Sequence, residues 1–394
     1  MSPRRILIVS SSRADWCHLR WPLEAMRRSP RLEPVLVATG ALLVPEYGRA
    51  VDVITRDGFA VDERIDCVLA SDTEAAAGRT IGLATIGFAD LLERRRPDAV
   101  LVMADRFEML APAAAALAAR VPIVHVEGGE ASTGVIDHAV RNALSMMASI
   151  HLVTTDLAAR RLVAMGEEPW RIHRTGAGSL DHLVRTPLPS FADVAARHGF
   201  EPEPDSVVVA YHPVTLDERP ADGIEAVLEG IAAAGVRAIF CHPNADAGGR
   251  AIVARMRDFA AGRPGDRVLV NLEPADYWSL LRGAAAMCGN SSSGIMESAS
   301  VGLPAVNIGP RQDGRERPAN VVDVPAEAGA IAAALREAIS PEARRRAAAA
   351  ENPYGDGHAS ERIVRVLEEL PPAERLLHKP PVPVPATAAS PVPT

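Results

Sequence analysis

Short apolar runs alternate with longer amphipathic stretches along most of this chain, which is the pattern of parallel α/β architecture. In the first half, the runs predict β-strands at Ile6–Ser10, Glu33–Ala38, Ala99–Met103, Ile123–Val126 and Ile150–Val153. Between these strands we predict helices at Trp16–Arg28, Thr73–Arg94 and Pro112–Ala119. Pro97 and Pro122 each precede a strand, a position where the missing N–H does no harm.

A second series of the same kind begins after Thr186–Pro189, which its two prolines mark as a linker. The strands predicted there are Ser206–Tyr211, Ala238–Cys241, Val268–Val270, Ala285–Cys288 and Ala305–Ile308, with helices at Ile224–Ala234 and Ala251–Ala261. Two successive doubly wound units predict a cleft between domains. Ligands bind such sheets at the carboxyl ends of the strands.

The C-terminal part of the chain changes character. Two further helices are predicted, at Ala326–Arg336 and Ser360–Leu370. The tail from Pro371 to Thr394 is dominated by Pro, Ala and Val and has no pattern for a packed core. We expect this tail to be disordered or partly polyproline II.

Composition narrows the class of protein. The chain has 394 residues, of which 48% are hydrophobic and 23% charged, as in a soluble globular protein of two domains or one large one. Its net charge of −8 argues against a general nucleic-acid binder. The four cysteines are widely spaced and contain no CxxC, which indicates a reducing compartment and gives no zinc signal.

The beginning of the chain, from Met1 to Ser10, places basic residues before a short apolar run. A signal peptide needs a longer apolar region and a small-residue cleavage site, so a buried first strand is the better interpretation. We find no apolar run long enough to span a bilayer, and therefore expect a cytoplasmic protein without a membrane partner.

The stretch Cys288–Glu297 carries the clearest candidate chemistry. It reads Cys-Gly-Asn-Ser-Ser-Ser-Gly-Ile-Met-Glu and follows an apolar run. Hydroxyl residues between glycines, at a turn into a helix, can offer N–H and Oγ groups to a phosphate. Glu297, one to two turns into that helix, could accept hydrogen bonds from a ribose diol. The alternative is a serine-rich turn that only caps the helix, and this stretch alone leaves both open.

Charged residues follow several predicted strands of the first half. After the first strand, Ser12 and Asp15 are best explained as helix caps, whereas Arg13 could bind a phosphate through its guanidinium fork. The third and fourth strands of this half are followed by four carboxylates: Asp105, Glu108, Glu127 and Glu130. Asp137 comes soon after.

Carboxylates at neighbouring strand ends can converge and raise one another's pKa, as general acid–base chemistry requires. For any single residue, loop solvation or helix capping is favoured, but the clustering favours a site. Arg141 falls about one helical turn after Asp137, and we interpret the two as a surface ion pair. His125, at a strand end, fits a core histidine with satisfied hydrogen bonds.

The second half repeats a strand followed by His-Pro, at His212 and at His242. His212 could donate to a phosphate or serve as an acid, although the prolines also simply end strands. No close spacing of His, Cys or carboxylate residues accompanies the two histidines, which argues against a metal. Arg311 and Arg315 follow a later strand, and in an acidic protein they indicate diphosphate recognition.

In combination, these motifs resemble the hydrolysing UDP-N-acetylglucosamine 2-epimerases. The resemblance lies in the stretches 12–15, 105–108, 127–130, 212–215, 244–248, 289–297, 307–315 and 354–357. They occur in order and run from about Ile6 to Leu370. Each motif is short, but the ordered set is specific.

The resemblance implies a fold like that of GT-B glycosyltransferases, with two Rossmann-like domains. It places the sugar and the catalytic carboxylates in residues 1–185 and the UDP mainly in residues 186–355. Residues 356–370 would then form a helix crossing back to the first domain, with residues 371–394 as a disordered tail. Members of this family are homo-oligomers, usually dimers or tetramers built from dimers.

The resemblance also implies a reaction. Such enzymes eliminate UDP from a UDP-activated 2-acetamido sugar and hydrate the resulting glycal. They release a 2-epimeric free sugar, N-acetylmannosamine or a diacetamido relative, which is used to build sialic-acid-like sugars. No redox cofactor and no obligatory metal are expected. The sugar's C4 and C6 substituents remain open.

Candidate roles follow from the matched motifs. The expected catalytic residues are Asp105, Glu130, Asp137 and His212. The expected UDP-sugar-binding residues are Arg13, Arg106, Arg141, Ser291, Ser292, Glu297 and Arg311. Among these, Arg13, His212, Ser291, Ser292 and Arg311 would hold the leaving diphosphate, and Glu297 the ribose. Proton abstraction and water activation would be carried out by Asp105, Glu130 and Asp137. The motifs do not show which residue performs which step.

Three departures from the family pattern keep rival functions open. Ala104 stands where the family usually has Gly before Asp105, the family's usual Lys is missing from 143–147, and Asn142 replaces the usual His after Arg141. Asn cannot titrate, so a proton relay through position 142 is lost. The rivals are a non-hydrolysing 2-epimerase, a glycosyltransferase on the same fold, and a nucleotide-sugar-binding protein without turnover.

Overall fold

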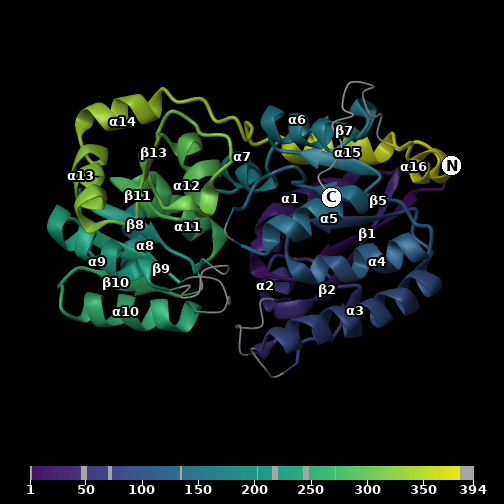
Figure 1. Cartoon of the computed structure of the whole chain (residues 1–394), viewed down its shortest axis with the longest axis horizontal. Helices are drawn as coiled ribbons and strands as arrows, with labels where there is room; N and C mark the ends of the chain where they lie inside the picture. The colour runs from purple at the N-terminus through teal and green to yellow at the C-terminus, as the bar shows by residue number, and fades with distance from the viewer. Residues whose placement is uncertain are drawn as a thin grey trace, which may run out of the picture.

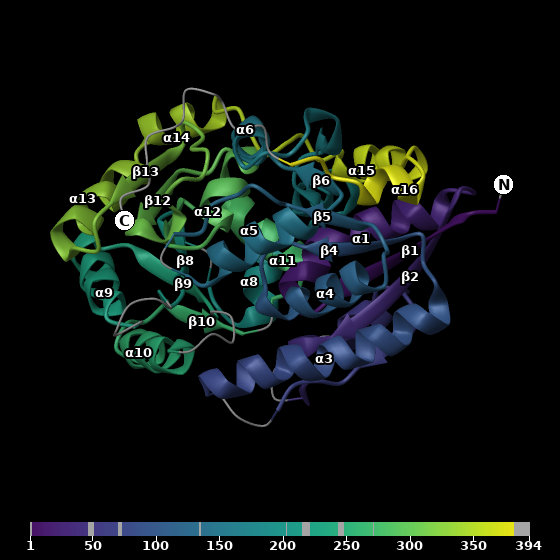
Figure 2. The same cartoon turned by 45° about the vertical axis from the view of Figure 1, so that its right-hand side comes forward.

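Two parallel β-sheets lie side by side in the computed structural model of the protein, each with helices packed around it (Figure 1). The structure describes residues 2–45, 51–69, 73–133, 135–201, 203–214, 221–242, 248–270 and 272–381. The view turned by 45° shows the same two units from another side (Figure 2).

The first sheet has seven strands in the order β3-β2-β1-β4-β5-β6-β7. They are β1 (Arg4–Ser10), β2 (Leu32–Thr39), β3 (Glu63–Ile65), β4 (Ala99–Met103), β5 (Ile123–Val126), β6 (Ile150–Val153) and β7 (Ile172–Arg174). Every pairing is parallel, and Ile8 lies opposite Leu36 on one side and Leu101 on the other. All residues of β4, β5 and β6 are buried, as expected for strands covered on both faces.

The second sheet has six strands in the order β10-β9-β8-β11-β12-β13, again all parallel. They are β8 (Ser206–Ala210), β9 (Arg237–Cys241), β10 (Arg267–Leu269), β11 (Ala286–Gly289), β12 (Ala305–Ile308) and β13 (Val321–Val324). The strands of the two sheets separate between Arg174 and Ser206, an interval that contains the predicted domain boundary at 185/186.

Helices connect most of the successive parallel strands, as crossover connections within a parallel sheet require. In the first unit they are α1 (Arg13–Arg28), α2 (Val51–Arg56), α3 (Glu74–Arg95), α4 (Leu110–Ala118), α5 (Asp137–Met147), α6 (Asp156–Ala164) and α7 (Asp181–Arg185). In the second they are α8 (Phe191–His198), α9 (Gly223–Ala234), α10 (Gly249–Ala261), α11 (Pro274–Gly283), α12 (Ser293–Met296), α13 (Ala328–Ala338) and α14 (Pro341–Ala348). Short 3-10 helices lie at Gly40–Leu42, Phe107–Met109, Pro169–Arg171, Gly178–Leu180, Ser298–Val301 and Pro310–Gln312.

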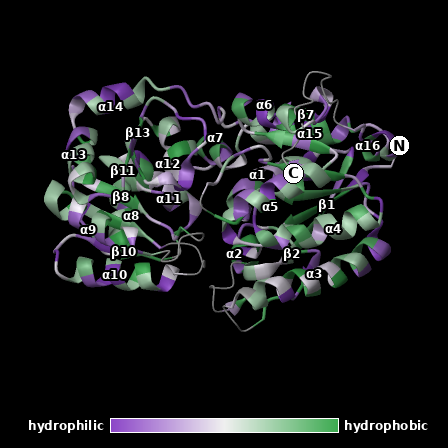
Figure 3. Ribbon diagram, viewed as in Figure 1, coloured by the Kyte–Doolittle hydropathy of each residue, from purple (hydrophilic) through white to green (hydrophobic). Residues whose placement is uncertain are grey.

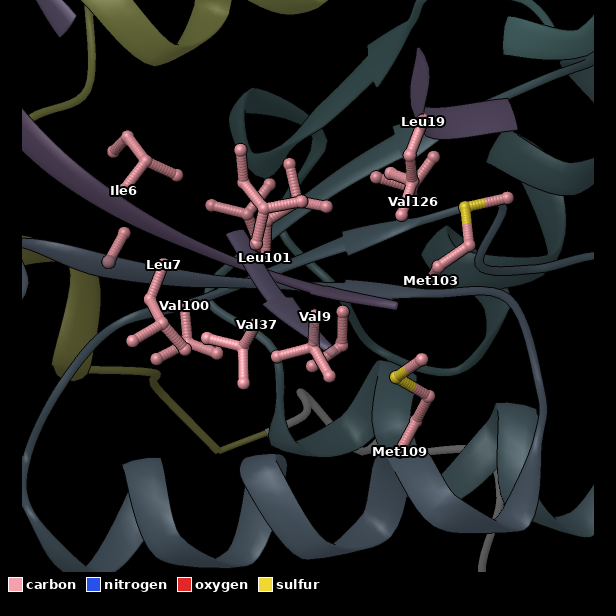
Figure 4. Close-up of a cluster of buried hydrophobic side chains, with 14 of the residues drawn as sticks. Ile6, Leu7, Val9, Leu19, Val37, Val100, Leu101, Met103, Met109 and Val126 are labelled. Carbon is pink, nitrogen blue, oxygen red and sulfur yellow. The ribbon is translucent and has the colours of Figure 1, made fainter. Parts of the chain in front are cut away.

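The core of the first unit forms where the apolar strands meet their covering helices. Ile6, Leu7 and Val9 of β1 pack with Val37 of β2 and Leu101 of β4, and all five are completely buried (Figure 4). Hydrophobic residues follow the central strands of both units, whereas the helices carry both hydrophobic and hydrophilic residues (Figure 3). Burial of this apolar surface is the main stabilising contribution to the fold.

The apolar runs predicted the inner strands well. The predictions for Ala99–Met103, Ile123–Val126, Ile150–Val153 and Ala305–Ile308 are confirmed to the residue. Three short strands, β3, β7 and β13, were not predicted. Each lies at the edge of its sheet, where only one side pairs and fewer side chains are buried, so its sequence lacks a continuous apolar run.

The C-terminal segment returns to the first unit, where α15 (Ala359–Glu368) packs against α1. The expectation of disorder from Pro371 onward is wrong for its first part, because α16 (Ala373–Leu377) follows and Leu376 is buried. Arg171 anchors this helix by donating to the carbonyls of Leu376 (2.9 Å) and His378 (2.7 Å). Residues 382–394 lie outside the described part of the chain.

From the sequence we expected no segment long and apolar enough to cross a membrane. Helix α3 does not fit that expectation. Residues 75–95 of α3 meet that test by length and composition, with a mean hydropathy of 1.2. The apolar side chains of Phe88 and Leu91 are buried in the core of the first unit. A core helix passes the same test, so this feature alone is weak evidence for a membrane span.

Candidate functional site

The strand order creates a switch point in each sheet. In the first sheet the order reverses between β1 and β4, and in the second between β8 and β11. Loops from neighbouring strands diverge at such a point, which leaves room for a ligand at the carboxyl ends. Arg13 and Asp105 follow β1 and β4, while His212 and the Gly289–Ser292 turn follow β8 and β11. Four of the predicted motifs therefore flank the two switch points.

The Gly289 turn requires a glycine for two reasons. Its φ of +139° lies in a region that favours glycine, and a Cβ there would lie 2.0 Å from the carbonyl oxygen of Ala210. Asn290, the next residue, holds the loop that follows the neighbouring strand β8. Its side-chain amide accepts from the N–H of His212 (2.7 Å) and donates to the carbonyl of His212 (2.8 Å). Arg311 donates to the carbonyl of Asn290 (3.1 Å). These bonds gather the loops of the second switch point.

The predicted helix after this turn is much shorter than expected. α12 is a single turn that ends at Met296, and Glu297 is its C-cap. Ser293 donates its hydroxyl hydrogen to Glu297, and Tyr277 donates to Ser293 (2.6 Å), so the carboxylate is held in place. Ser291 and Ser292 are partly exposed, which leaves their hydroxyl groups accessible to a ligand.

The β1–α1 turn confirms the interpretation of Ser12 and Asp15 as caps. Ser12 accepts from the N–H of Asp15, and the Asp15 carboxylate accepts from the N–H of Ser12 (2.9 Å), which forms a capping box. Burial raises the pKa of the thiols of Cys17 and Cys241 to about 12, and Arg13 acts against that rise in both. Cys17 lies in α1 of the first unit and Cys241 in β9 of the second, so the charge of Arg13 acts on groups of both units.

The buried Arg141 and the partly buried Asp105 form an ion pair, which the Ser132 hydroxyl joins. Arg141 donates to Ser132 (3.0 Å), and Ser132 donates to Asp105 (3.3 Å). Burial tends to raise the pKa of Asp105, but Arg141 and then Arg315 more than offset this, so its pKa lies below the usual range. The interpretation of Arg141 as half of a surface ion pair with Asp137 is wrong, because Arg141 is only 2% exposed.

Arg315 connects the two units; the sequence indicated diphosphate recognition for it, but it was not among the expected UDP-sugar-binding residues. It is buried, donates to the carbonyl of Ala131 (2.9 Å) and to Ser132 (3.4 Å), and contacts the sulfur of Met296 (2.9 Å). Burial disfavours its charge, but nearby carboxylates, Glu130 first, hold the pKa of Arg315 above its ordinary value. Its position in the motif at 311–315 was the available signal, but the motif alone did not show which arginine reaches the first unit.

A second ion pair joins the partly buried His18 of α1 to the buried Glu127, which follows β5. Nδ1 of His18 lies 2.6 Å from Oε1 of Glu127. Burial tends to lower the pKa of His18, but Glu127, Glu297 and Asp15 together raise it to about 9. The pKa of Glu127 is lowered because His18 outweighs the effect of burial. His18 was missed because a histidine in a helix interior carries no motif of its own.

Glu130, the other carboxylate in the loop after β5, does not bond to His18 but to residues that follow β6. It is buried and accepts hydrogen bonds from the hydroxyls of Thr154 and Thr155 (3.5 Å), which follow β6. Arg106 also pairs with a nearby residue. Its guanidinium donates two hydrogen bonds to the carboxylate of the buried Glu108 (3.1 and 3.2 Å).

Two histidines after strands are uncharged at neutral pH. His125 fits the predicted core histidine, because it is buried between Ala104 O (2.7 Å) and Ser145 Oγ (3.1 Å), and burial lowers its pKa to about 3. Burial and then Arg311 lower the pKa of His212 to about 3, so in the unliganded protein its imidazole is neutral. Thr215 and the predicted Asn244–Gly248 motif, up to Ala247, lie outside the described residues.

Asp137 begins α5, the helix that also supplies Arg141. On the same helix, Nδ2 of Asn142 lies 3.3 Å from Nε2 of His138. His138, like His18, was not predicted as a site residue.

A known protein family matches most of the chain, including most of these site residues. The model of the UDP-N-acetylglucosamine 2-epimerase family matches residues 24–368. The chain belongs to this family. It is 34% identical, over 95% of its length and 98% of the relative's, to a UDP-N,N′-diacetylbacillosamine 2-epimerase (hydrolyzing) of Legionella pneumophila. It is 33% identical, over 82% and 85% of the two chains, to a GDP/UDP-N,N′-diacetylbacillosamine 2-epimerase (hydrolyzing) of Campylobacter jejuni.

Solved structures show the same fold at low identity. The UDP-GlcNAc 2-epimerase of Neisseria meningitidis bound to UDP-GlcNAc superposes with a TM-score of 0.78 at 18% identity, over 92% of this chain and 99% of that one. A UDP co-structure from S. aureus gives a TM-score of 0.77 at 18% identity, over 93% and 96%. The predicted fold of two Rossmann-like sheets in a GT-B-like arrangement is confirmed, as is the predicted resemblance to hydrolysing 2-epimerases.

A pocket of about 600 Å³ lies in the first unit, next to the C-terminal helix α15. It is formed by β7 and α15 and is lined by Trp170, His173, Arg174, Arg362 and Arg365 among others. None of the predicted site residues lines it. Two of its arginines are neutralised, Arg174 by Asp156 and Arg362 by Asp356.

Proposed function

We propose that this protein is a hydrolysing UDP-sugar 2-epimerase. It eliminates UDP from a UDP-activated 2-acetamido sugar and then adds water to the glycal. In the elimination, a base takes the C2 proton and the C1–O electron pair leaves with the diphosphate. In the hydration, C2 gains a proton and C1 gains the hydroxyl of water. The products are UDP and the 2-epimeric free sugar.

One observation carries the proposal: Arg315, which follows β12 of the second unit, donates to the carbonyl of Ala131 (2.9 Å) and to the Ser132 hydroxyl (3.4 Å), and Ser132 bonds to Asp105 of the first unit. Arg311 and Arg315, which follow β12, both lower the pKa of Asp105, which follows β4. Glu297 of the second unit raises the pKa of His18 of the first. Charges from opposite units act on one another only if they are close together. A ligand between the units would therefore present its sugar to the first sheet and its diphosphate to the second.

The diphosphate has several candidate partners in the second unit. Ser291 and Ser292 offer hydroxyl groups, Arg311 offers a guanidinium, and His212 sits on the adjacent loop. Arg13 would approach from the first unit. Groups that stabilise the developing negative charge speed the loss of UDP, because that charge is larger in the transition state than in the substrate. Glu297 is assigned to the ribose.

The proton chemistry falls to the first unit. Asp105, ionised well below neutral pH, is available as a base, and Arg141 orients it. Glu127 belongs with the candidates, since it shares a proton-carrying pair with His18. Glu130, whose Oε1 accepts from two threonine hydroxyls and whose charge raises the pKa of Arg315, is better placed to support Arg315 than to reach a sugar. A catalytic role for Asp137 and a UDP-sugar-binding role for Arg106 remain predictions.

We infer a diacetamido sugar as the substrate to test first. Two relatives above 30% identity carry UDP-N,N′-diacetylbacillosamine in their names. We also expect a homodimer or a tetramer built from dimers, which light scattering after size exclusion would measure. A cytoplasmic location remains a prediction from the cysteine pattern. Independence from metals and redox cofactors remains a prediction that activity in excess EDTA, without added cofactor, would test.

The deciding experiment is incubation with UDP-N,N′-diacetylbacillosamine in deuterated water without an acceptor, followed by NMR. We expect free UDP and a free sugar that is inverted and deuterated at C2. Intact deuterated UDP-sugar would identify a non-hydrolysing epimerase. Binding without exchange would identify a binding protein, and reaction only after an acceptor is added would identify a transferase.

The variant Asp105→Asn keeps the shape of the side chain but cannot accept the C2 proton. We expect at least a 100-fold loss of C2 exchange, within the range of general base catalysis. Full exchange in a folded Asp105→Asn variant would remove Asp105 from the proton chemistry. Retained UDP binding, measured by calorimetry, would show that the site itself is intact.

A further inference from the structure

The asparagine that departs from the family pattern touches a histidine one turn earlier on α5. Residues four apart on a helix share a face, and Nδ2 of Asn142 lies 3.3 Å from Nε2 of His138. The resemblance described in the sequence analysis led us to expect a histidine at position 142. In this chain the imidazole is therefore present on the same helix face, displaced by one turn.

The surroundings of His138 place it beside the proposed sugar site. The charges that act on it are Arg141, Arg161 and Asp105, of which Arg141 and Asp105 form the ion pair of the site. Arg161 binds the loop carbonyl of Gly129 (3.2 Å). Burial, then Arg141 and Arg161, lower the pKa of His138, so the imidazole is a free base at neutral pH.

One nitrogen of this ring has no hydrogen-bond partner. Nδ1 of His138 is buried and is unpaired within the described part of the chain. A buried polar atom without a partner costs free energy, and a substrate group or a water molecule would remove that cost. Nδ1 is therefore the atom through which His138 would act.

Asn142 is suited to hold the ring while Nδ1 exchanges a proton. An amide carries a donor and an acceptor, and rotation by 180° exchanges them. Asn142 can therefore pair with Nε2 whether Nε2 is protonated or not. The ring keeps its position in both tautomers, and Nδ1 can give or take a proton.

We propose that His138 is the proton relay of the hydration step, taking the proton of the water that attacks the glycal. The inference rests on the proposed hydrolysing epimerase. Water oxygen bonds to C1 while a carboxyl on the far face of the sugar gives its proton to C2. Nδ1 of His138 takes the second proton of the water and passes it to the emptied carboxylate. The proton first removed from C2 leaves to solvent.

The test compares His138→Asn with the exchanged variant His138→Asn/Asn142→His, using UDP-N,N′-diacetylbacillosamine and NMR. In His138→Asn, we expect UDP release to continue while the glycal accumulates and free-sugar formation falls about 100-fold. In the exchanged variant the imidazole returns to position 142, and sugar formation should recover to within about tenfold of the unmodified protein. In the unmodified protein, hydration should fall as acidity protonates His138, and this decline should be absent from His138→Asn.

His173→Asn provides the matched control, because it makes the same chemical change on β7, away from the site, and should leave both steps within twofold. Free-sugar formation at the normal rate in folded His138→Asn would overturn the relay alone. Equal loss of elimination and hydration would also overturn it, because the role is specific to hydration. If the folded exchanged variant does not regain free-sugar formation, an imidazole at position 142 cannot replace the one at position 138, and that part of the proposal is refuted. Absence of UDP release from the unmodified protein would instead overturn the proposed function.

Discussion

The His18–Glu127 pair makes a measurable prediction about stability and pH. The side chains are 19% and 7% exposed, so water screens their interaction little. Glu127 first, and then Glu297 and Asp15, raise the pKa of His18 from 6.5 to about 9 against the opposing effect of burial. Each pKa unit corresponds to ~1.4 kcal/mol, so the protonated His18 among these carboxylates stabilises the fold by roughly 3 kcal/mol. Because the folded-state pKa is the higher one, this stability is complete below pH 6.5 and is lost as pH rises through about 9.

The perturbation is His18→Gln, which can still donate a hydrogen bond to Glu127 but cannot titrate. Its unfolding free energy, from urea titrations between pH 6 and pH 10, should lack the decline of roughly 3 kcal/mol seen in the unmodified protein. NMR of histidine-labelled protein measures the cause directly. The signal that disappears in His18→Gln should titrate near pH 9, and should titrate at lower pH in Glu127→Gln.

Two results would refute this reasoning. One is a His18 signal that titrates near pH 6.5 in the folded protein, since the carboxylate would then not be holding the proton. The other is a parallel loss of stability in the unmodified protein and in His18→Gln above pH 7, which would assign the alkaline decline to other groups.

Two further predictions concern the turn after β11. Ser292→Ala removes a hydroxyl assigned to the diphosphate and should weaken UDP binding roughly 5- to 20-fold, ~1–2 kcal/mol, by calorimetry; an unchanged Kd would contradict the assignment. Gly289→Ala should lower the melting temperature by about 6 °C or more, because it adds a clash with Ala210 to the backbone strain at φ +139°. Gly199→Ala is its control, since φ there is +70° with no atom within 4 Å of the added Cβ. Similar melting temperatures for these two variants would show that the clash is relieved cheaply.

Local features of the fold could be predicted because their causes are local. Buried parallel strands such as β4 appear as uninterrupted apolar runs, and the cap at Ser12 depends on residues only three positions apart. The tail was misjudged for a non-local reason. The carbonyls of α16 are satisfied by Arg171, a side chain from a distant part of the chain, and no composition rule for residues 371–394 contains that contact.

The site divides in the same way. The sequence alone determined which residue types follow which strands, and hence the motifs, the α/β class and the candidate groups for diphosphate and proton chemistry. Only the tertiary structure decided which candidates meet. Arg141 turned out to be buried against Asp105, Arg315 reached across from the second unit, and His18 joined Glu127. Strand order and the packing of one sheet beside the other bring these residues together, and both arise from long-range burial and pairing that a local pattern does not encode.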